Sequence, residues 1–185
     1  MRKLIAAINM TIDGFCDHTA VGADAETHQH YTELIRSVGT IIYGRITYQL
    51  MESYWPEIIK NPTTEKSTND FAAAIDQINK VVFSHTLKKL EWDSARIAEK
   101  SIKEEIIGLK NEHGRDILIG SPSLIISAMN LGLVNELQLM VHPAIVGKGL
   151  ALFQHIRDRV DLELLKTKTF KCGAVLFYYK TRFEA

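Results

Sequence analysis

The chain has 185 residues, enough to bury a core within one domain, so we expect a single domain over residues 1–185. Lysine plus arginine and aspartate plus glutamate number 22 each, which is not typical of a protein that binds nucleic acid through bulk positive charge. Apolar residues make up 46%, but no stretch is long enough to cross a bilayer, so no membrane partner is expected.

The amino-terminal segment predicts a first strand. Residues 1–14 begin with basic side chains, but their apolar run is short and meets Asn9 and Asp13, which does not fit a signal peptide. Cys16 and Cys172 are too few to staple a domain of this size and are typical of free thiols in a reducing compartment. We therefore expect a cytoplasmic protein.

A helix is predicted next, because apolar residues recur at spacings of three and four between Tyr31 and Val38. Asp24 is expected to cap its first turn. Histidines two apart on a helix point to different sides, and no familiar zinc spacing is present, so no metal is expected. The potential ligands considered for a metal are Cys16, His18, His28 and His30.

The segment IIYGRITY (41–48) joins a predicted buried strand to a predicted helix. Gly44 ends that strand, and open α/β sheets bind their ligands at this edge. A helix N-terminus offers unpaired N–H groups to an anion, glycine lets the anion approach, and Arg45 and Thr47 can donate further hydrogen bonds. The alternative is an ordinary turn glycine beside a solvated arginine.

Two more strand ends carry similar chemistry. The first, in VVFSHT, supplies Ser84, His85 and Thr86. The second, in DILIGSPSLI, supplies Gly120 and Ser121, with Ser121 as a predicted N-cap and Pro122 as the first helical residue. Three such sites favour an extended phosphorylated ligand such as a dinucleotide, although neither G-x-G-x-x-G nor a P-loop is present.

The rest of the chain completes an α/β pattern. Residues 60–70 are polar and predict a surface loop, and helices are predicted over 68–78 and 101–114. Near the end, 162–170 and 174–183 predict an antiparallel strand pair at the edge of a mixed, mainly parallel sheet flanked by helices. These apolar strands are also expected to pair across a subunit boundary in a homodimer.

Five segments in order resemble the dihydrofolate-reductase-like family, and specifically the branch similar to the reductase domain of bifunctional riboflavin-biosynthesis proteins. They are LIAAINMTIDG, YGRITY, VVFSHT, LIGSPSLI and GLVNELQLMVHPAIVGKGLALF. The resemblance implies that fold and a reductase that uses NADPH. It implies that Gly147 and Gly149 flank the substrate mouth. The cofactor-binding residues it implies are Ala7, Gly44, Arg45, Thr47, Ser84, His85, Thr86, Gly120, Ser121 and Leu124.

Three residues are candidates for substrate contact and proton delivery. Asp13 is either a polar contact for the substrate or a turn aspartate that binds nearby backbone. The resemblance implies a carboxylic acid on the first long helix, and the matching position falls near His28 with Glu26 beside it. A partly buried carboxylate or imidazole can be tuned toward neutral pH and deliver a proton. The aromatic residues considered for stacking on a flat heterocycle, although aromatics more often fill cores, are Tyr48, Trp55 and Phe153.

The resemblance also implies a substrate class. The riboflavin-pathway enzyme is 5-amino-6-(5-phosphoribosylamino)uracil reductase, which acts on a phosphorylated aminopyrimidine. The sequence shows no further basic cluster for that phosphate, so a stand-alone paralogue with another small heterocyclic or carbonyl substrate stays open. The alternative from a different class is a nucleotide-binding module, a sensor or scaffold that does not turn over.

Overall fold

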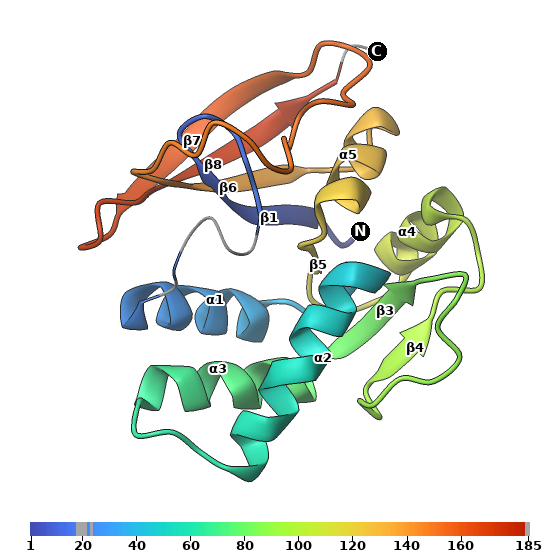
Figure 1. The fold of residues 1–185 in the computed structure, drawn as a ribbon. Coiled ribbons are helices and arrows are strands. Elements are labelled where there is room, and N and C mark those ends of the chain that lie inside the picture. The colour runs from blue at the N-terminus through green and yellow to red at the C-terminus, as the bar shows by residue number, and fades with distance from the viewer. Residues whose placement is uncertain (18–21, 23, 184–185) are drawn as a thin grey trace.

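One eight-stranded sheet forms the centre of the computed structural model, which describes residues 1–17, 22 and 24–183. The strands are β1 Leu4–Thr11, β2 Thr40–Gly44, β3 Asn79–Phe83, β4 Ala95–Ile97, β5 Ile117–Ile119, β6 Glu136–His142, β7 Asp161–Thr169 and β8 Val175–Arg182. They lie in the order β4-β3-β2-β5-β1-β6-β8-β7 (Figure 1). Neighbours from β4 to β6 pair in parallel, whereas β8 runs antiparallel to both β6 and β7. The predicted mixed sheet with its antiparallel C-terminal pair is confirmed.

Helices cover both faces of the sheet (Figure 1). They are α1 Ala25–Ser37, α2 Arg45–Lys60, α3 Lys66–Gln77, α4 Ile102–Asn111 and α5 Pro122–Asn130. Successive side chains of a strand point to opposite faces, so β1 contributes side chains to two cores. Leu4 and Ile8 pack with α4 and α5, while Ile5 and Ala7 pack with α1 and α3. No helix in the described part of the chain is both long and apolar enough to span a membrane.

Two local predictions were wrong, and one strand was not predicted. The predicted loop over 60–70 ends at Glu65, because α3 begins at Lys66. The side chain of Asn69 on α3 accepts the N–H of Thr63 (2.9 Å) and donates to its C=O (2.8 Å). The helix predicted over 101–114 ends at Asn111, since the polar residues that follow carry no apolar face. β4 was missed because three partly exposed residues show no periodicity.

The outer strand β7 is exposed along much of its length. Leu164 and Leu165 are 52% and 51% exposed, next to a β-bulge between Leu164 and Lys166. Bulges disturb the ladder of an edge strand and hinder its pairing with another chain. A homodimer through these C-terminal strands stays a prediction.

A buried arginine ties the amino terminus to the rest of the sheet. Arg2 is 6% exposed and donates to the backbone oxygens of Arg115 (2.5 Å) and Leu109 (3.3 Å) and to the Thr40 hydroxyl (2.9 Å). Arg2→Ala is expected to lower the free energy of unfolding by about 2 kcal/mol in urea denaturation, because these buried acceptors lose their donors. The exposed Arg159→Ala is the control, and equal losses in the two variants would contradict the assignment.

Candidate active site

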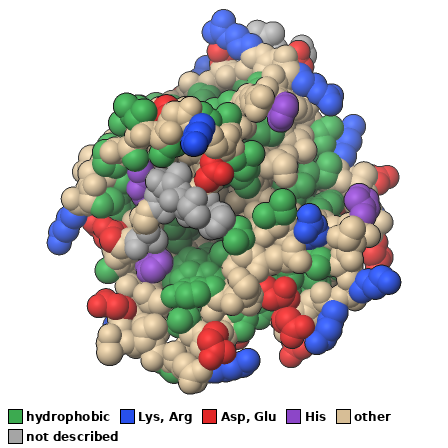
Figure 2. Space-filling model, viewed as in Figure 1, with side chains coloured by type: hydrophobic (Ala, Val, Ile, Leu, Met, Phe, Trp, Pro, Cys, Tyr) green, Lys and Arg blue, Asp and Glu red, His purple; other side chains and the backbone are tan. Residues whose placement is uncertain are grey.

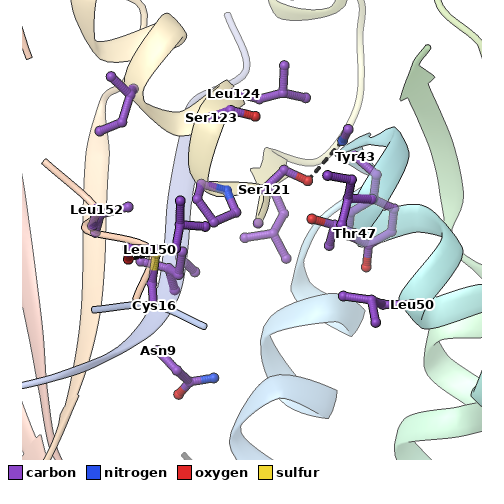
Figure 3. Close-up of a pocket in the computed structure, with 18 of the residues that line it drawn as sticks. Asn9, Cys16, Tyr43, Thr47, Leu50, Ser121, Ser123, Leu124, Leu150 and Leu152 are labelled. Carbon is purple, nitrogen blue, oxygen red and sulfur yellow. Dashed lines mark hydrogen bonds between the residues drawn. The ribbon is translucent and has the colours of Figure 1, made fainter. Parts of the chain in front are cut away.

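A cavity of about 1310 Å³ opens at the carboxyl-terminal edge of the central strands. β1, β2 and β5 contribute its floor, and α1, α2, α5 and residues 150–157 contribute its walls. Figure 3 shows side chains from these separate elements around one space, among them Asn9, Thr47, Ser121 and Leu150. Open α/β sheets bind ligands in such crevices, so this cavity is the candidate active site.

Two helix starts lie side by side at one end of the cavity. β2 and β5 are neighbouring parallel strands, so the helices that follow them begin at the same edge. The N–H of Gly44 donates to Oγ of Ser121 over 2.8 Å, the dashed line in Figure 3. We call these two helix starts the α2–α5 cradle, which consists of Gly44, Arg45, Thr47, Gly120 and Ser121.

The sequence predicted that the hydroxyl of Ser121 caps its own helix, and this prediction was wrong. Ser121 occupies the N-cap position of α5 but makes no capping bond, because its buried side chain (2% exposed) accepts from Gly44 instead. Neither α2 nor α5 has a side-chain cap or an acidic residue in its first turn. By contrast, Asp24 caps α1 as predicted, and a capping box caps the N-terminus of α4. The first amides of α2 and α5 therefore have no side chain competing with an anion.

Neither the backbone conformation nor the packing of the cradle requires glycine at positions 44 and 120. Gly44 has an ordinary φ of −82°, and Gly120 is not among the glycines with positive φ. A Cβ on Gly44 would lie 3.7 Å from the side chains of Leu124 and Ser121, an ordinary van der Waals contact. The absent Cβ thus leaves open space between the two helix starts, where an anion can approach the backbone.

The polar residues that follow β3, Ser84, His85 and Thr86, do not line the cavity. Oγ of Ser84 accepts the N–H groups of Thr86 (3.1 Å) and Leu87 (2.9 Å) and so closes a turn after β3. His85 and Thr86 are exposed and do not line the cavity, whereas Phe83, the last residue of β3, does. The predicted cofactor residues that line the cavity are Ala7, Gly44, Arg45, Thr47, Gly120, Ser121 and Leu124.

Asp13 joins two loops rather than facing the cavity. Its carboxylate accepts from the Thr11 hydroxyl (2.6 Å) and from the N–H groups of Gly147 (2.7 Å) and Val146 (3.1 Å). These hydrogen bonds, the Thr11 bond first, lower the pKa of Asp13. Asp13 does not line the cavity, nor do Gly147 and Gly149, which the resemblance placed at its mouth. Asp13 therefore fits neither expectation as stated, because it does not line the cavity and the backbone groups that it binds belong to a loop more than 100 residues away.

Glu26 and His28 lie on α1 but have different surroundings. Oε2 of Glu26 accepts the N–H of Lys171 over 2.9 Å, so this carboxylate fastens α1 to the β7–β8 turn and does not line the cavity. His28 does line it, with Nδ1 3.4 Å from the Thr68 hydroxyl. Burial lowers the pKa of His28 from its usual 6.5, and the negative charge of Asp24 opposes this shift in part. Among the three catalytic candidates, only His28 faces the cavity.

Sequence reasoning missed Asn9. It lines the cavity, and its Oδ1 lies 3.0 Å from Nε2 of the buried His142. Asn9 and Ala7 are two residues apart on β1, so they share a face of the sheet. The alternation of side chains along a strand therefore predicts Asn9 as a lining residue once Ala7 is placed at the site.

The aromatic candidates divide between core and cavity. Tyr48 is fully buried in the core, and Phe153 is exposed and does not line the cavity, whereas Trp55 lines it together with Phe71. His30 packs edge-on against Phe170 (5.7 Å between ring centroids), and burial lowers its pKa to about 4. No cluster of three potential metal ligands occurs within the described ranges, and His18 lies outside them.

The sheet order, the antiparallel C-terminal pair and a cavity between α1, α2 and α5 define a dihydrofolate-reductase-like fold. The dihydrofolate reductase of Enterococcus faecalis, complexed with NADP(H) and RAB-propyl, is similar with a TM-score of 0.65 and 14% identity over 98% of this chain and 97% of that one.

Within this class the chain belongs to the RibD C-terminal domain family, the riboflavin-pathway type of reductase domain, whose model matches residues 2–176. The uncharacterised protein YyaP of Bacillus subtilis (strain 168) is 33% identical over 182 residues, 96% of this chain and 94% of that protein. RibD of Acinetobacter baumannii is similar with a TM-score of 0.72 and 13% identity, over 98% of this chain and 58% of RibD.

Proposed function

We propose that the protein is an NADPH-dependent reductase of a small heterocyclic or carbonyl compound. The observation that carries this proposal is the α2–α5 cradle, in which two uncapped helix starts meet through the Gly44–Ser121 hydrogen bond at one end of a cavity of about 1310 Å³. Membership of the RibD C-terminal domain family supports it, as does the likeness in fold to a dihydrofolate reductase that holds NADP(H).

The residues of the cradle fit the diphosphate of NADPH. The first amides of α2 and α5 would bind its oxygens, and the Thr47 hydroxyl would add a donor. Arg45 is exposed and donates to Oε1 of Gln49, one turn further along α2, over 3.0 Å, so its guanidinium would exchange this bond for one to the diphosphate. Ala7 and Asn9 on β1 would border the nicotinamide, from which bound NADPH supplies a hydride.

NADPH is expected to quench the fluorescence of the protein, because Trp55 lines the same cavity. Arg45→Ala is expected to weaken binding about tenfold, through loss of a charge-assisted hydrogen bond worth about 1.4 kcal/mol. The exposed Arg159→Ala, whose arginine lies outside the cavity, is the control and should bind as the wild type does. Equal affinity of Arg45→Ala and the wild type would remove Arg45 from the site.

The alternative is a nucleotide-binding module without turnover. It is favoured by the absence of a carboxylate on the cavity side of α1 in the described residues, since Glu26 bonds Lys171 instead. A fall in the absorbance at 340 nm that depends on an added carbonyl or heterocyclic compound separates the two functions. Binding of NADPH without oxidation across a broad panel of such compounds would favour the module.

A further inference from the structure

The far end of the cavity has a wall of apolar and aromatic side chains from α1, α2 and α3. We call it the aromatic wall, and its residues are Tyr31, Ile35, Leu50, Met51, Trp55 and Phe71. Figure 3 shows Leu50 extending from α2 toward the cavity, and Figure 2 shows hydrophobic side chains gathered on this face of the molecule. His28 is the titratable neighbour of the wall on α1, and burial lowers the pKa of its imidazole.

The rings in this region pack against one another at an angle. The centroids of Trp55 and Phe71 are 4.4 Å apart, with 52° between their planes. His28 meets Trp55 edge-on at 5.8 Å and lies tilted against Phe71 at 5.8 Å. Such packing holds the rings in place, and a flat conjugated ligand can stack on them without ordering flexible side chains.

In the described part of the chain, no lysine or arginine belongs to the aromatic wall. Among the described residues, the lysines and arginines that line the cavity are Arg45 and Arg157 alone. Arg45 opens α2 ten residues before Trp55, about 15 Å along a helix, and its guanidinium reaches along α2 as far as Gln49, six residues before Trp55. The backbone of Arg157 bonds Asn130, at the opposite end of α5 from the cradle. The sequence has no lysine or arginine at residues 18–21 and 23, which lie outside the described part.

We infer that the substrate of the proposed reductase is a flat, conjugated carbonyl or heterocyclic compound that carries no phosphate or carboxylate. A phosphate against this wall would lose its hydration without gaining a charged partner, at a large cost in free energy. This inference rests on the proposed function and departs from the phosphorylated aminopyrimidine that the resemblance implied. Reduction of a conjugated aldehyde breaks the C4–H bond of the dihydronicotinamide and forms a C–H bond at the carbonyl carbon. The carbonyl electron pair moves to the oxygen, which takes one proton.

The test is a comparison of two probes that differ by one negative charge. 2-Naphthaldehyde is flat and uncharged, and 6-formyl-2-naphthoic acid adds a carboxylate to the same rings. Binding is measured by calorimetry on the full chain with NADP⁺ present, so that no turnover occurs. The uncharged probe is expected to bind at least about tenfold more tightly, since burying an unpaired carboxylate is costly.

Charge placed in the wall should reverse the preference. Met51→Arg, and Leu50→Arg at the more exposed rim, are each expected to bring the ratio of the dissociation constant of the acid to that of the aldehyde to one or below. Ile59→Arg makes the same change on an exposed part of α2 outside the cavity and should leave the ratio as in the wild type. Circular dichroism checks that each variant is folded.

Equal binding of the two probes, tighter binding of the acid, or binding of neither would overturn the inference. A titration with NADPH alone keeps this result separate from the cofactor proposal. If NADPH binds and the probe preference is absent, the substrate class is wrong while the reductase proposal stands. If NADPH does not bind, the proposed function itself fails.

Discussion

Thr47→Asp is expected to weaken NADPH binding about 100-fold while leaving the protein at least as stable as the wild type. Thr47 is the third residue of α2 and lines the α2–α5 cradle. An aspartate in the first turn of a helix interacts favourably with the helix dipole, so the folded state gains. The same carboxylate repels a diphosphate at close range, so binding loses about 2.8 kcal/mol, the equivalent of 100-fold. Affinity comes from fluorescence titration and stability from urea denaturation.

Ser67→Asp is the matched control for this experiment. α3, like α2, has neither a side-chain cap nor an acidic residue in its first turn, and Ser67 does not line the cavity. The control should show the same small change in stability and no change in affinity for NADPH. If Thr47→Asp binds NADPH as well as Ser67→Asp does, the cradle does not hold the diphosphate.

His28→Gln is expected to lower kcat about 100-fold near pH 6 and to flatten its dependence on pH. Protonated His28 would donate the proton that the reduced substrate needs, since the imidazole faces the cavity beside Trp55 and Phe71. Burial lowers the pKa of His28 below its usual 6.5, so the imidazolium is lost as pH rises through that lowered value. In the wild type, kcat should therefore fall with rising pH across the neutral range.

Glu26→Gln is the control, because Glu26 lies two residues away on α1 and bonds Lys171 outside the cavity. It should keep the pH profile of the wild type, measured as loss of the 340 nm absorbance with a saturating carbonyl substrate. A His28→Gln variant that retains the falling limb of the profile would assign proton delivery to another group.

The cradle could be predicted from the sequence because its signals are local. A glycine after a buried apolar run marks the end of a strand, and strands that end in this way bring their helices to one edge of the sheet. The partner of the Ser121 hydroxyl could not be predicted in the same way. Gly44 and Ser121 are 77 residues apart, and only the pairing of β2 with β5 brings them together. An N-cap preference describes the position of Ser121 but not the direction of its hydroxyl.

The substrate end was harder to predict, because there the same residue types serve as core and as cavity lining. Trp55 and Phe71 have the spacing of core residues on their helices, and only the gap between α1, α2 and α3 makes them lining. Asp13 and Glu26 were selected for their chemistry, but each carboxylate accepts backbone N–H groups from a loop more than 100 residues away. Such contacts depend on how the C-terminal loops return to the sheet, which short-range patterns do not contain.

A crystal structure with NADP⁺ tests the diphosphate assignment more directly than any substitution. Phosphate oxygens are expected within about 3 Å of backbone nitrogens in the first turns of both α2 and α5, across the space that Gly44 leaves open. A cofactor that binds elsewhere, with both of these helix starts still facing solvent, would contradict the account.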